Sequence, residues 1–258
     1  MIHVLDKAYD NPLEAEEQAT VPFVGGIRQH GYQCGQIWGA SLAGGARMLQ
    51  KLTPGSEAST RALMASQGLV DDFREISGEV NCHEITSIDK DSSNLDLVNY
   101  FLLKGGSIGC FRMASKYAPQ AYESIEKSLE TDQVRIPDSQ PSCTALLAEK
   151  MDASPRHQTM VAGLAGGIGL CGEACGALGT AVWLHALETQ TNNPEIDLWQ
   201  DRQFGARFES LVEAFLQASD YEFECKDIVG RKFENIQDHA DFLERGGCQN
   251  IIEALAAV

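Results

Sequence analysis

The residues of this 258-residue chain best suited to chemistry are its eight cysteines. Cys171 and Cys175 are four residues apart, and the first half of the chain has His30 and Cys34 at the same spacing. Side chains four positions apart share one face of a helix. Cysteine and histidine both bind zinc and the iron of iron–sulfur clusters, so each pair is a candidate part of a metal site.

The cysteines recur because the chain repeats itself. An offset of 141 residues places Gly25 on Gly166 and Cys34 on Cys175. With small slips in register, two further cysteine pairs match, Cys82 with Cys225 and Cys110 with Cys248. Such a repeat indicates two related structural units. We predict halves at residues 1–135 and 142–258, with the boundary in a polar stretch interrupted by Pro137 and Pro141.

Helical elements must position these cysteines. Phe208, Leu211, Val212 and Phe215 recur at helical spacing, and no convincing run of alternating strand residues is present. We therefore predict an all-α protein built from two homologous helical-bundle halves related by internal duplication.

Each half contains one candidate set of metal ligands. The first set is His30, Cys34, Cys82 and Cys110. The second set is Cys175, Cys225 and Cys248, together with Cys171 or Cys143. Because the members are far apart in sequence, the fold must bring them together. Cys175 is also a candidate nucleophile, since the glycine-rich segment 166–169 leads into its helix and a positive helix end lowers the pKa of a thiol.

Other patterns have simpler interpretations. Segment 167–172 matches G-x-G-x-x-G, but a helix follows it rather than a strand ending in an acid, so we favour close helix packing over nucleotide binding. Segment 160–187 carries one charge, Glu173, yet contains seven glycines, which predicts a glycine turn and a buried helix rather than a membrane span. His185 lies in an apolar helix and is expected to pack in the core.

The charge balance limits the partners. Lys plus Arg is 20 and Asp plus Glu is 37, so the net charge is −17. An acidic surface repels phosphate backbones, which argues against nucleic-acid binding and favours a partner with a basic patch. The first residues show no export signal, so we expect a cytoplasmic protein in which cysteines serve metal or redox chemistry. A homodimer is the default oligomer.

The second half resembles the family of redox-active proteins named for its cysteine pattern, C_GCAxxG_C_C. The matching segments are 141–147, 163–169, 175–177, 225–230 and 248–252. The resemblance implies a redox role and assigns it to Cys143, Cys175, Cys225 and Cys248. A similar domain occurs in split-Soret cytochromes, which implies an iron–sulfur centre. The glycine after the C-G-A centre comes one residue early, at Gly179, and Cys171 is an addition to the pattern.

The first half resembles a degenerate copy of the same pattern. It keeps three of the cysteines but has none near position 2, where Ile2 stands in the place of Cys143. In this half His30 is the candidate substitute for the missing ligand.

These observations lead to one hypothesis and two alternatives. We expect a redox protein that holds a cysteine-ligated metal or an iron–sulfur cluster and passes electrons to an unidentified redox partner protein. The first alternative is a thiol–disulfide oxidoreductase in which Cys175 attacks and Cys171, Cys225 or Cys248 resolves. The second is a zinc-stabilised interaction module without catalytic activity.

Overall fold

The computed structural model describes residues 1–103, 105–132 and 134–258. In these ranges the chain forms fourteen α-helices and two short irregular helical turns, and its only β-pairing is two isolated bridges, so the all-α prediction is confirmed. The first half contains α1 (Ile2–Ala8), α2 (Glu14–Gln18), η1 (Val21–Phe23), α3 (Gly35–Lys51), α4 (Ser56–Ser77), α5 (Cys82–Thr86), α6 (Asn94–Val98), the π-helical turn η2 (Asn99–Leu103) and α7 (Gly106–Glu130). The second half contains α8 (Cys143–Lys150), α9 (Pro155–Ala162), α10 (Gly176–Asn192), α11 (Arg202–Ala218), α12 (Cys225–Val229), α13 (Ile236–Glu244) and α14 (Gln249–Ala256).

The helix α11 shows how the local sequence specifies these elements. Asp201 stands before the helix, and its side chain accepts a hydrogen bond from the Phe204 backbone N–H at 2.6 Å, which satisfies a donor left free at the helix start. Phe208, Leu211 and Phe215 follow at helical spacing and are buried on one face. The periodicity in this segment therefore predicted the helix correctly.

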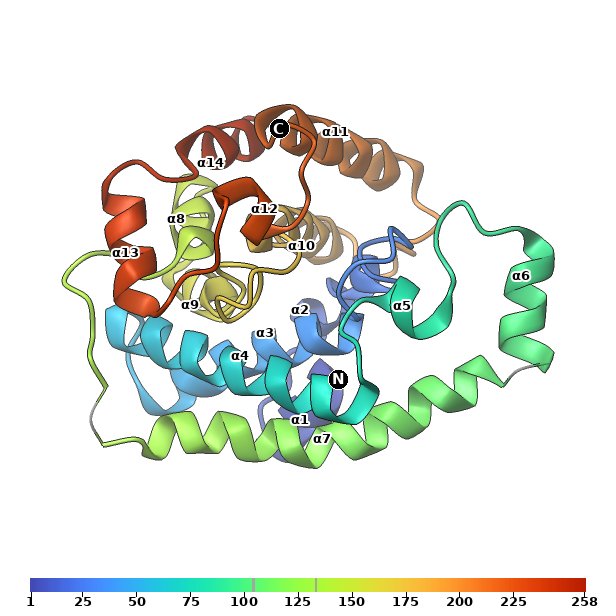
Figure 1. The fold of residues 1–258 in the computed structure, drawn as a ribbon, viewed down its shortest axis with the longest axis horizontal. Helices are drawn as coiled ribbons and strands as arrows, with labels where there is room; N and C mark the ends of the chain where they lie inside the picture. Colours follow the sequence, from blue (N-terminus) through green and yellow to red (C-terminus); the bar gives the residue numbers. More distant parts are fainter. Residues whose placement is uncertain (104, 133) are drawn as a thin grey trace.

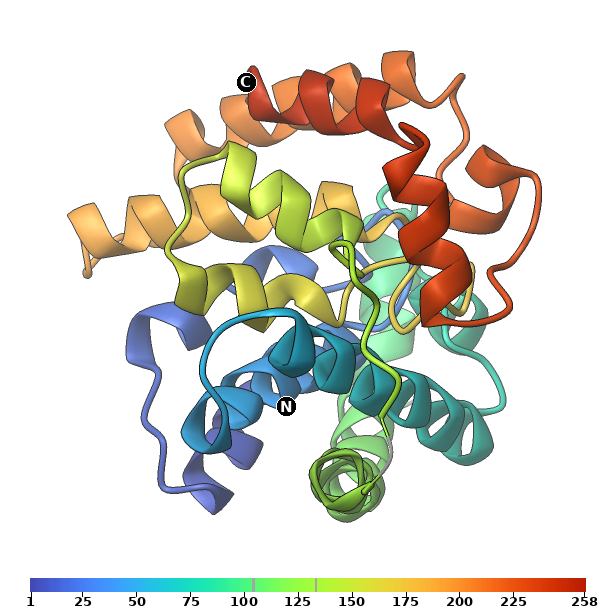
Figure 2. The same ribbon diagram turned by 90° about the vertical axis from the view of Figure 1, so that its left-hand side faces the viewer.

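The two halves form two layers that share one core. Figures 1 and 2 show the first half (blue to green) below and the second half (yellow to red) above, with α7 along the lower edge. Helix α9 packs against α3 and α4 at the junction, while α10 packs against α2. Trp38 of the first half and Trp183 of the second are both fully buried in the common core. The halves are therefore packed against each other extensively.

The duplication is visible in the backbone. The isolated bridge between Gln33 and Asn81 has its counterpart in the bridge between Ala174 and Glu224. Beside the first bridge, the Cys34 N–H donates to the Val80 carbonyl at 2.9 Å. Beside the second, the corresponding donor is the Cys175 N–H, which bonds the Phe223 carbonyl at 3.0 Å. The predicted relationship between the halves is thus confirmed at the level of single hydrogen bonds.

The apolar glycine-rich segment 160–187 is not one helix. Helix α9 ends at Ala162, a loop occupies residues 163–175, and α10 begins at Gly176, as the glycine content predicted. In the described ranges no helix is both long enough and apolar enough to span a bilayer.

Candidate redox site

A tightly closed loop precedes each of the matched cysteines Cys34 and Cys175. In the second half the Gly172 N–H donates to the Gly166 carbonyl at 2.9 Å, and in the first half the Gly31 N–H donates to the Gly25 carbonyl at 3.0 Å. All four glycines have positive φ, which glycine adopts without steric cost. The loops therefore end by directing the chain into α3 and α10.

These loops correct two expectations about spacing. Cys171 lies within its loop and Cys175 immediately precedes α10, so the prediction that they share one face of a helix is wrong, and the same holds for His30 and Cys34. Side chains four residues apart share a face only where the backbone is helical. The backbone here is not helical, because Leu170 has a positive φ of 62°. Among the glycines of 167–172, Gly172 closes the loop, whereas Gly169 lies against the backbone of α4, as the expectation of close packing predicted.

Four cysteines of the second half lie at the N-terminal ends of four different helices. Cys143 is the first residue of α8 and Cys225 the first of α12, while Cys175 and Cys248 immediately precede α10 and α14. Helices α8, α10 and α14 pack against one another, and the bridge from Ala174 joins the segment leading to α10 to the one leading to α12. We call these four side chains the second-half thiol cluster.

The four thiols influence one another electrostatically. The pKa of Cys143 is raised to about 12, first by burial and then by Cys175. Burial also raises the pKa of Cys225 far above its usual range, with additional contributions from Cys175, Cys143 and Cys248. The pKa of Cys248 is raised by burial and then by Cys143 and Cys175. All four are free cysteines.

Cys175 does not have the lowered pKa that its helix position predicts. The backbone N–H groups of Ala177 and Leu178, at the start of α10, do act to lower the pKa of this thiol. Burial has the larger effect, and the pKa of Cys175 is raised. The expectation is wrong because it considered the helix dipole without the cost of removing a thiolate from water.

The donor set determines which groups the cluster suits. The charged groups that raise the pKa of Cys225 and Cys248 are all thiols. Sulfur donors without carboxylates are typical of zinc and iron–sulfur sites. Within the described ranges, no group of three or more His, Cys, Asp or Glu side chains is arranged to hold a metal ion. The donor types are therefore those of zinc and iron–sulfur sites, whereas the described side chains are not arranged as a ready-made metal site.

Other groups surround Cys171 and His30. The Cys171 sulfur contacts the Gly169 carbonyl at 3.7 Å, and burial raises its pKa to about 11. The charged groups around it are Asp71, Arg74, Glu173 and Lys232. The His30 ring lies 6.0 Å from that of Phe208; burial lowers the pKa of this histidine, with a further contribution from Lys90.

The other three candidate cysteines are brought together in the first half. Cys34 immediately precedes α3, Cys82 begins α5, and Cys110 lies in the second turn of α7. The pKa of Cys34 is raised to about 12, mainly by burial and in smaller part by Cys82 and Cys110. We call these three side chains the first-half thiol cluster. Tyr100 lies beside them, with its hydroxyl 3.9 Å from the Cys110 sulfur, and the sequence analysis did not identify this residue.

An aromatic contact joins the two bridges. The rings of Tyr32 and Phe223 stack with their centroids 3.5 Å apart and an interplanar angle of 3°. The Tyr32 carbonyl accepts the Cys82 N–H at 2.7 Å, and the Phe223 carbonyl accepts the Cys175 N–H. The two stacked residues therefore each accept a backbone hydrogen bond from a cysteine, Tyr32 from Cys82 in the first half and Phe223 from Cys175 in the second half. The sequence contains no local signal for it, because the two rings come from different halves.

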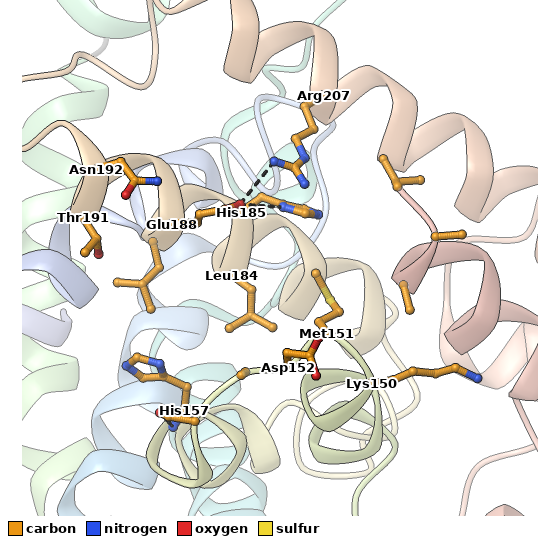
Figure 3. Close-up of a pocket in the computed structure, with 16 residues that line it drawn as sticks. Lys150, Met151, Asp152, His157, Leu184, His185, Glu188, Thr191, Asn192 and Arg207 are labelled. Atoms are coloured by element: carbon orange, nitrogen blue, oxygen red, sulfur yellow. Dashed lines mark hydrogen bonds and ion pairs between the residues drawn. The ribbon is translucent and has the colours of Figure 1, made fainter.

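Two hollows differ in their relation to the thiols. A hollow of 440 Å³ is lined by Leu146, Gly247, Gln249 and Ile252, among others, and two of these residues flank Cys248 in the sequence. A larger hollow of 650 Å³ is shown in Figure 3. Its polar lining includes the buried His185, which with Arg207 contacts Glu188. His185 follows Cys175 by ten residues, about 15 Å along α10, so His185 lies far from the Cys175 thiol.

Comparison with known proteins agrees with this arrangement. No curated protein and no solved structure matches the chain. The family model described as "Putative redox-active protein (C_GCAxxG_C_C)" matches residues 1–124 and again residues 139–258. Since these two matches cover nearly all of the sequence, the chain belongs to the C_GCAxxG_C_C family of redox-active proteins and contains two tandem copies of its pattern.

Proposed function

We propose that this redox protein holds an iron–sulfur cluster on the second-half thiol cluster and transfers electrons to a partner protein. The observation that supports the proposal is that Cys143, Cys175, Cys225 and Cys248 each stand at the start of a helix, and that the other three thiols all raise the pKa of Cys225. Four cysteine thiolates are the usual ligand set of two-iron and four-iron clusters.

The site compensates the negative charge that such a ligand set would carry. Each helix N-terminus carries partial positive charge, so the starts of α8, α10, α12 and α14 favour thiolates over thiols. Metal binding requires deprotonated cysteines, and their raised pKa values make the metal-free thiols keep their protons. A bound cluster would supply one-electron chemistry at this site.

Residues around the thiols would set the reduction potential. Cys143, Cys175 and Cys225 are at most 8% exposed, which disfavours a gain of negative charge on reduction. The N–H groups of Ala177 and Leu178 act in the opposite direction by stabilising negative charge on the Cys175 sulfur. The potential therefore reflects a balance between burial and backbone hydrogen bonding.

The charge of the chain supports a basic partner. A net charge of −17 would steer a positively charged protein toward this surface, and salt would weaken that association. The hollow beside Cys248 would provide the closest approach to the cluster. The eight free cysteines suit a reducing compartment such as the cytoplasm.

One observation favours thiol–disulfide exchange as a second candidate. The antiparallel bridge between Ala174 and Glu224 sets Cys175 opposite Phe223 and Cys225 opposite Glu173, so the two cysteines lie diagonally across paired backbone segments. Their oxidation to a disulfide would release two electrons and two protons to a disulfide substrate, which would be reduced to two thiols. The raised pKa values of both thiols oppose this role, because the thiolate is the attacking species.

Metal and sulfide analysis of anaerobically purified protein tests the proposal. We expect bound iron, acid-labile sulfide and broad absorbance in the region of about 400 nm that Cys175→Ala diminishes. Cys171→Ala is the matched control, because Cys171 lies four residues away and outside the cluster. Stoichiometric zinc without iron would overturn the proposal in favour of a structural module. Metal-free protein with a reversible two-electron thiol titration would overturn it in favour of disulfide exchange.

A further inference from the structure

The larger hollow, shown in Figure 3, has the size and lining of a small-molecule site. Its wall is formed by the end of α8, the start of α9, the second half of α10, Arg207 of α11 and residues 256–258, and no described lining residue is a cysteine. At the offset of the repeat, Gly44 and Arg47 stand in the places of His185 and Glu188. The hollow is therefore a feature of the second half alone, and the cysteine pattern does not account for it.

A buried histidine in this wall lacks a hydrogen-bond partner. His185 is 6% exposed, and its Nε2 atom has no partner in the described part of the chain. Its Nδ1 atom lies 3.6 Å from a carboxylate oxygen of Glu188, which favours the tautomer with the proton on Nδ1. Burial and then Arg207 lower the pKa of His185 against the opposing effect of Glu188, so the ring is neutral at pH 7. Nε2 is then an acceptor without a donor.

A ligand that donates a hydrogen bond to Nε2 would satisfy this acceptor. Buried polar atoms in proteins nearly always have a partner, because an unmade hydrogen bond is costly away from water. In Figure 3 the His185 ring lies between Arg207 and Met151, both of which line the same hollow. The missing donor is therefore expected from a molecule bound in the hollow.

The charges of the wall favour a cation. Arg207 is already paired with Glu188 at 3.2 Å, and Lys150 with Glu253 at 3.5 Å. Asp152 is exposed, and among the described residues its carboxylate has no hydrogen-bond or ion-pair partner. Helices α8 and α10 both end at the hollow, and a helix C-terminus carries partial negative charge. These two basic side chains are thus neutralised, whereas negative charge is left for a ligand.

We propose that this hollow binds a small organic amine, whose ammonium group donates a hydrogen bond to His185 Nε2 and whose carbon chain packs against Met151, Leu184 and Leu187. Asp152 and the ends of α8 and α10 attract the positive charge. A neutral alcohol would satisfy Nε2 without this attraction, and a carboxylate would be repelled. The inference is independent of the proposed function, because it involves none of the thiols.

Nuclear magnetic resonance of the full chain labelled with ¹⁵N-histidine tests the site. The probes are n-pentylamine, n-pentanol and n-pentanoate, which have similar carbon chains and differ in charge. We expect n-pentylamine to shift the His185 Nε2 resonance and to bind more tightly than the other two probes. Equal or tighter binding of n-pentanol or n-pentanoate would overturn the assignment to a cation. If no probe shifts the His185 resonance, the hollow is not a binding site.

Three variants, measured by calorimetric titration with n-pentylamine, assign the residues. His185→Phe should weaken binding about tenfold or more, because a hydrogen bond to a charged group is lost. Asp152→Asn carries little risk to folding because the side chain is exposed, and it should weaken binding about twofold to fivefold while leaving n-pentanol binding unchanged. His157→Gln is the matched control, since His157 lines the same hollow but its Nε2 already lies 3.5 Å from Glu16.

The control variant should bind n-pentylamine as the wild type does. Wild-type affinity in both His185→Phe and Asp152→Asn would overturn the proposal. If His185→Phe fails to fold, the loss in Asp152→Asn and its absence in His157→Gln still decide the outcome, and equal affinities in these two variants would count against the site.

Discussion

The raised pKa of Cys143 predicts very slow alkylation in the folded, metal-free protein. Its ordinary pKa is 9.0 and burial raises it to about 12, so the thiolate fraction at pH 8 falls about a thousandfold. Since iodoacetamide reacts with the thiolate, Cys143 should be alkylated about a thousandfold more slowly than in the unfolded chain. Pulsed labelling followed by peptide mass spectrometry measures this rate for each cysteine.

Cys171 provides an internal control for this measurement. Burial raises its pKa to about 11, so its thiolate fraction falls only about a hundredfold. Cys171 should therefore react about tenfold faster than Cys143 in the same sample. Alkylation of Cys143 within tenfold of its rate in urea would refute the reasoning, because the thiol would then be close to its ordinary ionisation. It would also favour disulfide exchange over cluster binding.

The remaining predictions concern stability. Burial raises the pKa of Asp6 to about 8, and neither carboxylate oxygen has a hydrogen-bond partner in the described structure. The free energy of unfolding should therefore fall as pH rises from about 4 to 8, because the folded state holds this proton more tightly than the unfolded chain. Urea titrations of Asp6→Asn should show a smaller fall. Phe223→Ala should lower the free energy of unfolding, measured in urea, by about 3–5 kcal/mol, because it removes the ring stack between the halves. Tyr221 is 73% exposed, so Tyr221→Ala should change the free energy of unfolding little. Gly169→Ala should lower the melting temperature more than Gly230→Ala. Both glycines have positive φ, but of the two only Gly169 lies against neighbouring backbone. Equal shifts in melting temperature would contradict this account.

The repeat made the overall architecture predictable. Glycines and cysteines matched at an offset near 141 residues, with small slips in register, because they occupy equivalent backbone positions; Gly25 (φ 72°) and Gly166 (φ 65°) are one such pair. Helical periodicity identified α11 because one of its faces is buried. These signals are local or periodic, so they can be recognised from the sequence alone.

The path of the loop at 163–175 was not predictable in the same way. A spacing of four between Cys171 and Cys175 suggests a helix, but Ile168 and Leu170 take positive φ values that their residue types do not indicate. The loop is closed by hydrogen bonds such as that from Gly169 N–H to the Gly163 carbonyl at 2.9 Å. Tertiary packing against α4 then holds this conformation.

Burial and long-range contacts decided the chemical environment of the candidate site. The sequence places Cys175 at a helix start but does not show that desolvation outweighs the helix dipole. Tyr100 has no counterpart among the matched cysteines, so only the fold reveals its contact with Cys110. The family resemblance identified Cys143, whose distance in sequence from the other thiols gives no spacing signal.

Diffraction at the iron absorption edge tests the central claim most directly. Crystals of the full chain grown without oxygen should show an anomalous peak enclosed by the sulfurs of Cys143, Cys175, Cys225 and Cys248. An ordered structure in which iron-loaded protein places its metal elsewhere, with these four sulfurs far apart, would contradict the account.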